Sequence, residues 1–320
     1  MSQIRYRLDE NVAYYHLMSR TVNGEAWFGG VEREVLRKMI WQVSAFSGVR
    51  LITYAVMKNH FHLLVEVPPR ATEVSDRELV RRFRVLYPRP TPWQPMGWRS
   101  LRRHLRENTK EGVEMRDRLL ERMHDPSWLM RTIKQRFARW FNATKDRFGP
   151  VWSERFKSVL VEGDHWALKT VAAYIDLNAV RAGLVDDPKD YRFCGYAEAL
   201  AGNSDARAGL RLVAKDLADY RQILFGAGSG AKAEKFSISR EDALRVLEKE
   251  RGKLPIPVLL RCRMRYFSDG KILGSEKFVS ENVGKASLDS PPKVPPAHRM
   301  EGGDWNGLSV AQGLRKKLFS

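Results

Sequence analysis

The spacing of apolar residues near the start of the chain predicts a strand followed by a helix. Residues 11–22 are rich in aromatic and β-branched side chains and end at Asn23-Gly24, a turn signal. Residues 31–46 carry apolar side chains three and four positions apart, until Gly48 ends the pattern. This spacing is typical of an amphipathic helix with one buried face.

The patterns that follow along the chain predict the remaining elements of a ferredoxin-like arrangement. Residues 50–57 and 59–67 are strand-like runs with almost nothing between them, which indicates an antiparallel hairpin. Residues 151–162 predict another strand, and residues 165–182 predict a helix that ends at Gly183. The order β-α-β-β-α-β is the split β-α-β arrangement. We therefore expect an α+β fold, with a ferredoxin-like antiparallel sheet and its helices on one side.

The segment between the hairpin and the last predicted strand is long and basic. Residues 73–86 have a helical pattern, but residues 87–98 contain four prolines and a glycine and cannot continue a helix. Two basic stretches, roughly 100–123 and 127–145, are predicted as helices. We interpret residues 87–126 as an insertion into the ferredoxin-like fold.

The pattern changes after about residue 200, so residues 1–200 are predicted to form the main domain. Residues 201–235 include the run GAGSGAKAEK and are interpreted as a linker. Residues 236–285 predict a small helical C-terminal module, which is a candidate DNA-binding element or an interaction cap. Residues 286–320 are too rich in proline and glycine to pack and are predicted to form a flexible tail.

Composition and charge point to a polyanionic partner. The 320 residues are 43% hydrophobic, which is enough to bury a core. The 56 Lys and Arg exceed the 38 Asp and Glu by +18, more than solubility requires. Residues 51–150 hold 21 basic and 11 acidic side chains, so this stretch is a candidate nucleic-acid surface. Solvated helix faces account for the same charges equally well.

Cysteine content and hydropathy exclude several classes of protein. Cys194 and Cys262 are too few for a disulfide scaffold or a zinc-finger array, so a reducing compartment is expected. No apolar run approaches the roughly 20 residues needed to cross a bilayer, and residues 1–10 do not resemble a signal peptide. We expect a soluble intracellular protein with no membrane partner.

Two short strings carry candidate chemistry. In NHFHLLV, His60 and His62 are two apart on a predicted strand, so both imidazoles project from one face and could bind one metal ion. A surface or hydrogen-bonded pair is the more common reason for this spacing. In YIDLNAVRAGL, Tyr174, Asn178 and Arg181 share a face of the predicted helix. A core helix with one tyrosine at its edge explains that string as well.

The two strings together with FGPVWSERFKSVLVE resemble the REP-associated tyrosine transposases, a branch of the HUH single-tyrosine, IS200-like transposases. YHLMSR, VMKNHFHLLVEVP and RWFNATKDRFGPVW agree with the same family pattern, in the same order. The resemblance covers about residues 11–200, apart from the insertion at 87–126.

The resemblance implies a role for each matching residue. His60 and His62 would be metal ligands, with Asn178 as the third protein ligand, and Tyr174 would be the nucleophile. The metal would be Mg²⁺ or Mn²⁺. The protein would cleave and rejoin single-stranded DNA at hairpin-forming repeats through a 5′-phosphotyrosine intermediate, in the bacterial cytoplasm and as a monomer.

Two positions depart from the family pattern. Asp176 and Ala179 stand where the family commonly has His and Pro. Asp176 is expected to point away from the tyrosine face, although an added carboxylate near the site could alter the choice of metal. His16 is interpreted as a packed core histidine and is left out of the ligand set.

Basic side chains near these motifs are candidate DNA contacts. Arg155 and Lys157 are two apart on the predicted strand and could hold phosphates, or could protect a strand edge. Arg181 is a third candidate. On the predicted helix 127–145 the outward-facing candidates are Arg131, Lys134, Arg136 and Arg139. In the C-terminal module the candidates are Arg261, Arg263 and Arg265.

Three functions are compatible with these residues. The first is the metal-dependent DNA transesterase already described. The second is a non-catalytic nucleic-acid-binding regulator on the same fold, and the third is a metal-dependent phosphodiesterase that uses water as its nucleophile. Because the tyrosine, the asparagine and both histidines are all present, the first is favoured.

Overall fold

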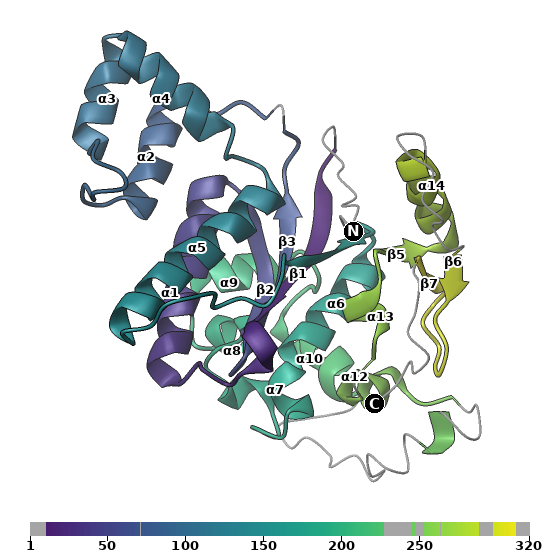
Figure 1. Cartoon of the computed structure of the whole chain (residues 1–320). Coiled ribbons are helices and arrows are strands. Elements are labelled where there is room, and N and C mark those ends of the chain that lie inside the picture. The colour runs from purple at the N-terminus through teal and green to yellow at the C-terminus, as the bar shows by residue number, and fades with distance from the viewer. Residues whose placement is uncertain are drawn as a thin grey trace.

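The computed structural model describes residues 11–70, 72–226, 245–247, 253–262, 264–287 and 297–311. Its seven strands form one mixed sheet (Figure 1) in the order β2-β3-β1-β4-β5-β7-β6. The strands are β1 (Ala13–Arg20), β2 (Arg50–Val56), β3 (His60–Val67), β4 (Lys157–Val161), β5 (Ile272–Ser275), β6 (Ala297–Arg299) and β7 (Leu308–Ala311).

The first four strands confirm the ferredoxin-like prediction. β1 lies between β3 and β4 and is antiparallel to both, and β2 and β3 form the predicted hairpin. Asn23 and Gly24 both have positive φ, as the predicted turn after β1 requires. The predicted strand 151–162 is shorter than expected, because regular pairing begins only at Lys157.

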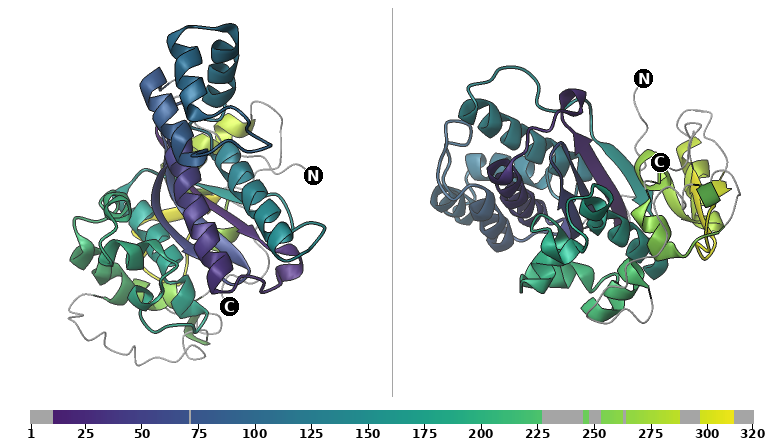
Figure 2. Two further views of the ribbon diagram at one scale, coloured as in Figure 1. Left: turned by 90° about the vertical axis from the view of Figure 1, so that its left-hand side faces the viewer. Right: turned by 90° about the horizontal axis from the view of Figure 1, so that it is seen from below.

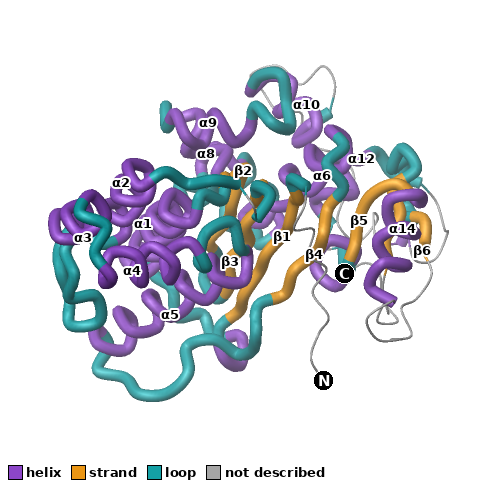
Figure 3. The backbone as a smooth tube through the Cα atoms, turned by 90° about the horizontal axis from the view of Figure 1, so that it is seen from above, coloured by secondary structure: helices purple, strands orange, loops and turns teal. Residues whose placement is uncertain are grey.

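Helices lie on both faces of the sheet, and not on one side as predicted (Figure 3). One face is covered by α1 (Gly30–Ser47) and α5 (Pro126–Thr144). The other face is covered by α6 (His165–Asp176) and by the helices between residues 178 and 269. The physical reason is that β1, β2 and β3 are apolar at consecutive positions, so both of their faces require a cover.

The second helical layer includes residues that were predicted to be a linker. Its members after α6 are α7 (Asn178–Arg181), α8 (Gly195–Leu200), α9 (Ser204–Leu210), α10 (Leu217–Phe225) and α12 (Ile256–Arg261). Leu210, Tyr220 and Leu224 are buried in the same hydrophobic core as α6. Residues 201–226 of the predicted linker therefore belong to this folded layer, and the remainder of the predicted linker lies outside the described residues.

The C-terminal segment contains helices, as predicted, but its strands extend the main sheet, so it is not a separate module. β5 pairs in parallel with β4, and β7 pairs with both β5 and β6. The helices of this segment are α12, α13 (Tyr266–Asp269) and α14 (Glu276–Ser287). β6 and β7 fall within the predicted tail, which is therefore partly folded. Trp305, between them, is only 2% exposed.

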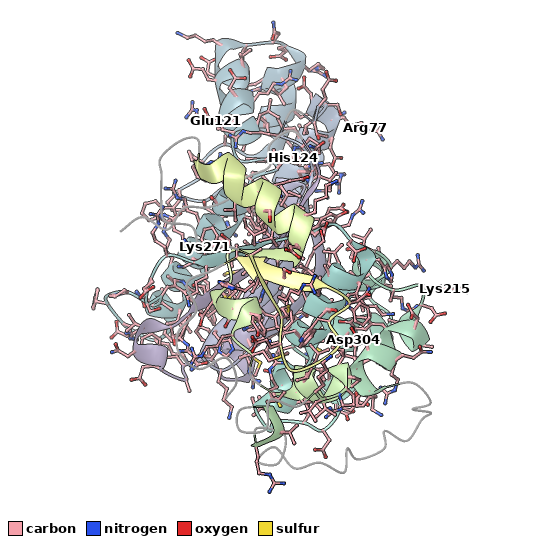
Figure 4. All side chains as sticks on the ribbon, turned by 90° about the vertical axis from the view of Figure 1, so that its right-hand side faces the viewer. Arg77, Glu121, His124, Lys215, Lys271 and Asp304 are labelled. Atoms are coloured by element: carbon pink, nitrogen blue, oxygen red, sulfur yellow. The ribbon has the colours of Figure 1, made fainter. Side chains whose placement is uncertain are left out.

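The predicted insertion at 87–126 contains α3 (Trp98–Arg106) and α4 (Lys110–Leu120), and with α2 (Asp76–Leu86), which precedes it, it forms a helical protrusion (Figures 1 and 2). α3 and α4 pack closely, since a Cβ on Gly112 would lie 2.6 Å from the His104 carbonyl oxygen. The protrusion joins the body where the His124 amide donates to the Ser47 carbonyl at 2.9 Å. Figure 4 labels His124 there, with Arg77 and Glu121 on the protrusion.

Within the described ranges, no helix combines the length and the apolar character that crossing a membrane requires.

Candidate active site

A pocket of about 590 Å³ lies where β1 ends and β3 begins. It contains all four side chains predicted as metal ligands or nucleophile: His60, His62, Tyr174 and Asn178. These residues come from β3, α6 and α7, so the fold brings together groups more than 100 positions apart in the sequence.

Both histidines of the NHFHLLV string project from the same face of β3. Their ring centroids are 5.1 Å apart and the rings are nearly perpendicular, at 88°. Phe61 and Leu63 are fully buried in the core on the opposite face, as strand alternation predicts. The His60 Nδ1 atom lies 2.6 Å from the Asn59 Oδ1 atom, and this contact orients the first ring.

His16 fixes the orientation of the second histidine. It is fully buried on β1, with Nδ1 2.9 Å from the Phe267 carbonyl oxygen and Nε2 2.9 Å from the His62 Nδ1 atom. Because burial removes water, it lowers the pKa of His16 to about 3, so the ring is neutral at physiological pH. Burial also holds the pKa of His62 well below its usual range.

These contacts determine which His62 nitrogen bears a hydrogen. A carbonyl oxygen can only accept, so His16 donates from Nδ1 to Phe267 and its neutral Nε2 accepts. His62 must then donate from Nδ1, which leaves a lone pair on its Nε2. A metal-binding imidazole needs this arrangement, in which one nitrogen donates to a neighbour and the other binds the ion. Sequence reasoning placed His16 in the core but did not identify this contact.

Tyr174 lies between an aromatic ring and a guanidinium group. Its ring stacks on Phe267 with centroids 4.5 Å apart, and the Arg181 Cζ atom lies 3.9 Å from its centroid. The residue is 4% exposed, and it lines the pocket 6.5 Å from the His62 ring between centroids. The contacts with the Phe267 ring and the Arg181 guanidinium restrict the Tyr174 ring to one orientation beside the histidines.

Asn178 lines the pocket, but the helix that carries it differs from the predicted one. The predicted continuous helix 165–182 is interrupted at Leu177, which ends α6 and precedes the short helix α7. The Asn178 Nδ2 atom donates to the Ile175 carbonyl at 3.0 Å. Since that bond uses the amide nitrogen, the Oδ1 atom is the group of Asn178 that suits a metal ion.

The residues present can form a mixed nitrogen and oxygen donor set. Among the described residues, no three His, Cys, Asp or Glu side chains are grouped to share a metal ion. Two imidazoles and one amide line the pocket instead. This combination fits a divalent cation whose remaining coordination positions are filled by substrate oxygens and water.

Five of the predicted DNA contacts also line this pocket, and three of them are Arg155, Lys157 and Arg181. Arg155 is exposed and lies in the loop before β4 rather than on the strand. The Lys157 Nζ atom pairs with Asp269 at 3.0 Å. Arg181 donates to the carbonyls of Tyr174 and Leu260, each at 2.7 Å, so it holds α6 against α12. Arg155 is therefore the best placed of the three for a phosphate.

Of the three C-terminal arginines predicted as DNA contacts, two line the pocket. Arg261 and Arg265 line the pocket, and the Arg265 Nη1 atom is 3.4 Å from Asp269. Arg263 lies outside the described residues. The segment predicted as a separate DNA-binding module thus forms one wall of the candidate active site.

The basic residues of α5 do not line the pocket, because α5 covers the opposite face of the sheet. Arg131 and Arg139 stack on Trp128 and Trp93, at 4.7 and 4.5 Å from the ring centroids. Arg136 lies 5.6 Å from the Tyr87 ring centroid. The Lys134 Nζ atom donates to the Glu154 carbonyl at 2.6 Å, which links α5 to the loop that carries Arg155.

Asp176 points away from the pocket, as expected, and is held by a buried network. Its carboxylate accepts from the Tyr220 hydroxyl at 2.6 Å, from Thr53 at 2.8 Å and from the Tyr196 amide at 3.2 Å. Burial raises the pKa of Asp176 to about 6, although these hydrogen bonds oppose the shift. The carboxylate therefore binds α6 to β2 and α10, and it is not an additional metal ligand.

Removing the Tyr220 hydroxyl is expected to destabilise the fold. Tyr220→Phe deprives a buried carboxylate of its shortest hydrogen bond, and we expect a loss of about 1.5–3 kcal/mol in the free energy of unfolding. Urea denaturation measures this loss. Tyr191→Phe is the control, because that buried hydroxyl donates to the Val56 carbonyl and accepts from Arg33 but bonds no buried carboxylate. A Tyr220→Phe loss no larger than the control loss contradicts the role given to the carboxylate.

A comparison with protein families finds a match to part of the chain. Residues 10–84 match the IS200-like transposase family. The IS200-like segment runs from β1 to α2 and includes His16, His60 and His62, whereas Tyr174 and Asn178 lie beyond it. A solved structure of a REP-associated tyrosine transposase bound to a REP hairpin is also similar, with 16% identity and a TM-score of 0.39 over 63% of this chain and 87% of that chain. No curated protein matches the chain.

Proposed function

We propose that the protein is a metal-dependent transposase that cleaves and rejoins single-stranded DNA at hairpin-forming repeats through Tyr174. The observation that supports this proposal most strongly is that one pocket combines a tyrosine with two histidines, an asparagine and the exposed Arg155. The IS200-like segment, which contributes both pocket histidines, supports the same class of reaction.

The proposed reaction exchanges one phosphate ester for another. The Tyr174 hydroxyl oxygen attacks the phosphorus of a DNA phosphodiester, and the bond from phosphorus to the 3′ oxygen breaks. The products are a 5′-phosphotyrosine and a free 3′-OH, which receives the proton that the phenol loses. Attack by a 3′-OH on the phosphotyrosine reverses the step and rejoins DNA without ATP, since the number of phosphodiester bonds is conserved.

The pocket residues have distinct tasks in this reaction. His60, His62 and Asn178 would hold Mn²⁺ or Mg²⁺, and two nitrogen ligands favour Mn²⁺ because Mg²⁺ prefers oxygen. When bound, the cation would polarise the phosphate and offset the charge of the transition state. His16 keeps His62 in the tautomer that can bind it, and Phe267 and Arg181 hold the Tyr174 ring in place. Arg155 would bind a flanking phosphate.

A covalent adduct is the decisive expected result. The full chain is incubated with a labelled DNA hairpin that carries single-stranded flanks, with Mn²⁺ or with a chelator. We expect a slower-migrating species on a denaturing gel only with the metal, and peptide mapping should locate the phosphate on Tyr174. Cleavage without attached protein indicates water as the nucleophile, and hairpin binding without cleavage indicates a non-catalytic regulator. Either result contradicts the proposal.

A further inference from the structure

The helical protrusion carries an unusual concentration of arginine. Residues 79–106 contain eight arginines and no aspartate or glutamate. Residues 110–121, which include α4, contain three basic and four acidic side chains. Positive charge is therefore concentrated on one part of the protrusion, and the neighbouring helix of the same protrusion is nearly neutral.

Four of these arginines form a single stripe along α3. Arg99, Arg102, Arg103 and Arg106 are all exposed and occupy positions i, i+3, i+4 and i+7, which share one face of a helix. The opposite face is apolar, with Leu101 fully buried and Leu105 packed against the core. At 1.5 Å per residue the stripe is about 10 Å long, which spans about three phosphates of one DNA strand at 3.4 Å each.

The stripe has few internal partners. In the described part of the chain, no carboxylate forms an ion pair with Arg99, Arg102 or Arg103, whereas Arg106 is 3.6 Å from Glu107. The arginines of α4 are paired instead: Arg116 with Asp76 at 3.2 Å, and Arg118 with Glu114 at 3.4 Å. The charge on α3 is thus available to an external anion.

Neighbouring aromatic residues hold the arginine surface in a defined shape. The Arg84 and Arg99 guanidinium groups lie 4.9 and 4.8 Å from the Trp98 ring centroid, so Trp98 orders one end of the stripe. Trp93, which is 75% exposed, lies in the loop before α3 and stacks on Arg139 of α5. This pair continues the basic surface from the protrusion onto the body of the protein.

We propose that the α3 stripe, continued by Trp93 and Arg139, is a second nucleic-acid surface that binds the phosphate backbone of duplex DNA. The stripe lies on a protruding helix (Figure 1), and a convex surface suits the outside of a duplex better than a flexible single strand, which requires a groove. The inference rests on the proposed function, since it assigns the duplex stem of the hairpin to the protrusion and the single-stranded flank to the pocket.

Paired variants of the full chain test this inference. Binding of a fluorescent hairpin and of a single strand of equal length is measured by anisotropy in chelator, between about 50 and 200 mM salt. Arg102→Gln with Arg103→Gln should weaken hairpin binding on the order of tenfold and reduce the slope of log affinity against log salt by about 2. The control, Arg116→Gln with Arg118→Gln, removes the same charge from α4 and should change affinity less than twofold.

Three outcomes overturn the inference: no effect of the α3 variant, an equal effect of both variants, or equal binding of the single strand and the hairpin by the wild-type protein. Thermal melting checks that both variants are folded. Adduct formation by the α3 variant at saturating protein should equal that of the wild type. Failure of the adduct reaction in every protein would therefore refute the proposed function while the binding comparison remained valid.

Discussion

Tyr174→Phe is expected to abolish the covalent protein–DNA adduct. The substitution removes only the phenolic oxygen, so the stack on Phe267 and the contact with the Arg181 guanidinium both remain possible. Loss of an enzyme nucleophile reduces the rate by roughly 10³-fold or more, so the adduct should fall below detection with Mn²⁺ present. Hairpin affinity should stay within about twofold of the wild type, because the ring and its charged neighbours are unchanged.

The control for this prediction is Tyr14→Phe. Tyr14 lies on β1, where its hydroxyl donates to Glu66 at 3.3 Å, and it does not line the pocket. Its adduct yield should equal that of the wild type. An adduct that persists in Tyr174→Phe would show that another residue is the nucleophile. Loss of the adduct in both variants would indicate a general effect of tyrosine replacement on folding.

A chain that ends at Gly226 is expected to lose its stable fold. The truncation removes β5, β6 and β7 and the buried side chains of α12 and α13, which cover part of the sheet. It also removes the carbonyl that accepts from His16 and one of the two carbonyls that accept from Arg181, and a buried polar group left without a partner costs about 1–3 kcal/mol. With the exposed apolar surface added, the loss is comparable to the 5–15 kcal/mol by which a domain is stable.

Circular dichroism and thermal melting of the truncated chain test this second prediction. The comparison is the full-length variant Phe267→Leu, which keeps the carbonyl that accepts from His16 but removes the ring that stacks on Tyr174. That variant should fold cooperatively, with a modest loss of stability of about 1–2 kcal/mol. A soluble truncated chain with a cooperative transition near that of the full protein would instead show that the N-terminal part is an autonomous domain.

Local sequence patterns were sufficient for the first four strands and for both pocket histidines. The alternation of polar and apolar residues placed His60 and His62 on one face because the side-chain period of a strand is fixed by its geometry. The family resemblance of the strings around Tyr174 and Asn178 placed both residues at the site, and both line the pocket even though Leu177 interrupts the helix between them. The placement of side chains that depends on spacing within one element was therefore predictable.

Features that depend on distant partners were not predictable. β5, β6 and β7 have only three or four residues each, which is too few for a periodic pattern. They form because β5 pairs with β4, and β7 pairs with β5 and β6. The glycine- and proline-rich sequence around Trp305 indicated a tail, but Trp305 is buried against Phe267. Likewise, only the tertiary structure shows that His16 contacts His62.

The bond from His16 to the Phe267 carbonyl joins residues 251 positions apart. A protein emerges from the ribosome from its N-terminus, so both histidines, Asn178 and Tyr174 are synthesised well before the segment that holds them in position. A nascent or prematurely terminated product would contain every proposed reactive group and still have no complete pocket. Under the proposed function, DNA breakage would therefore require the segment around Phe267 to have been made, because that segment completes the pocket.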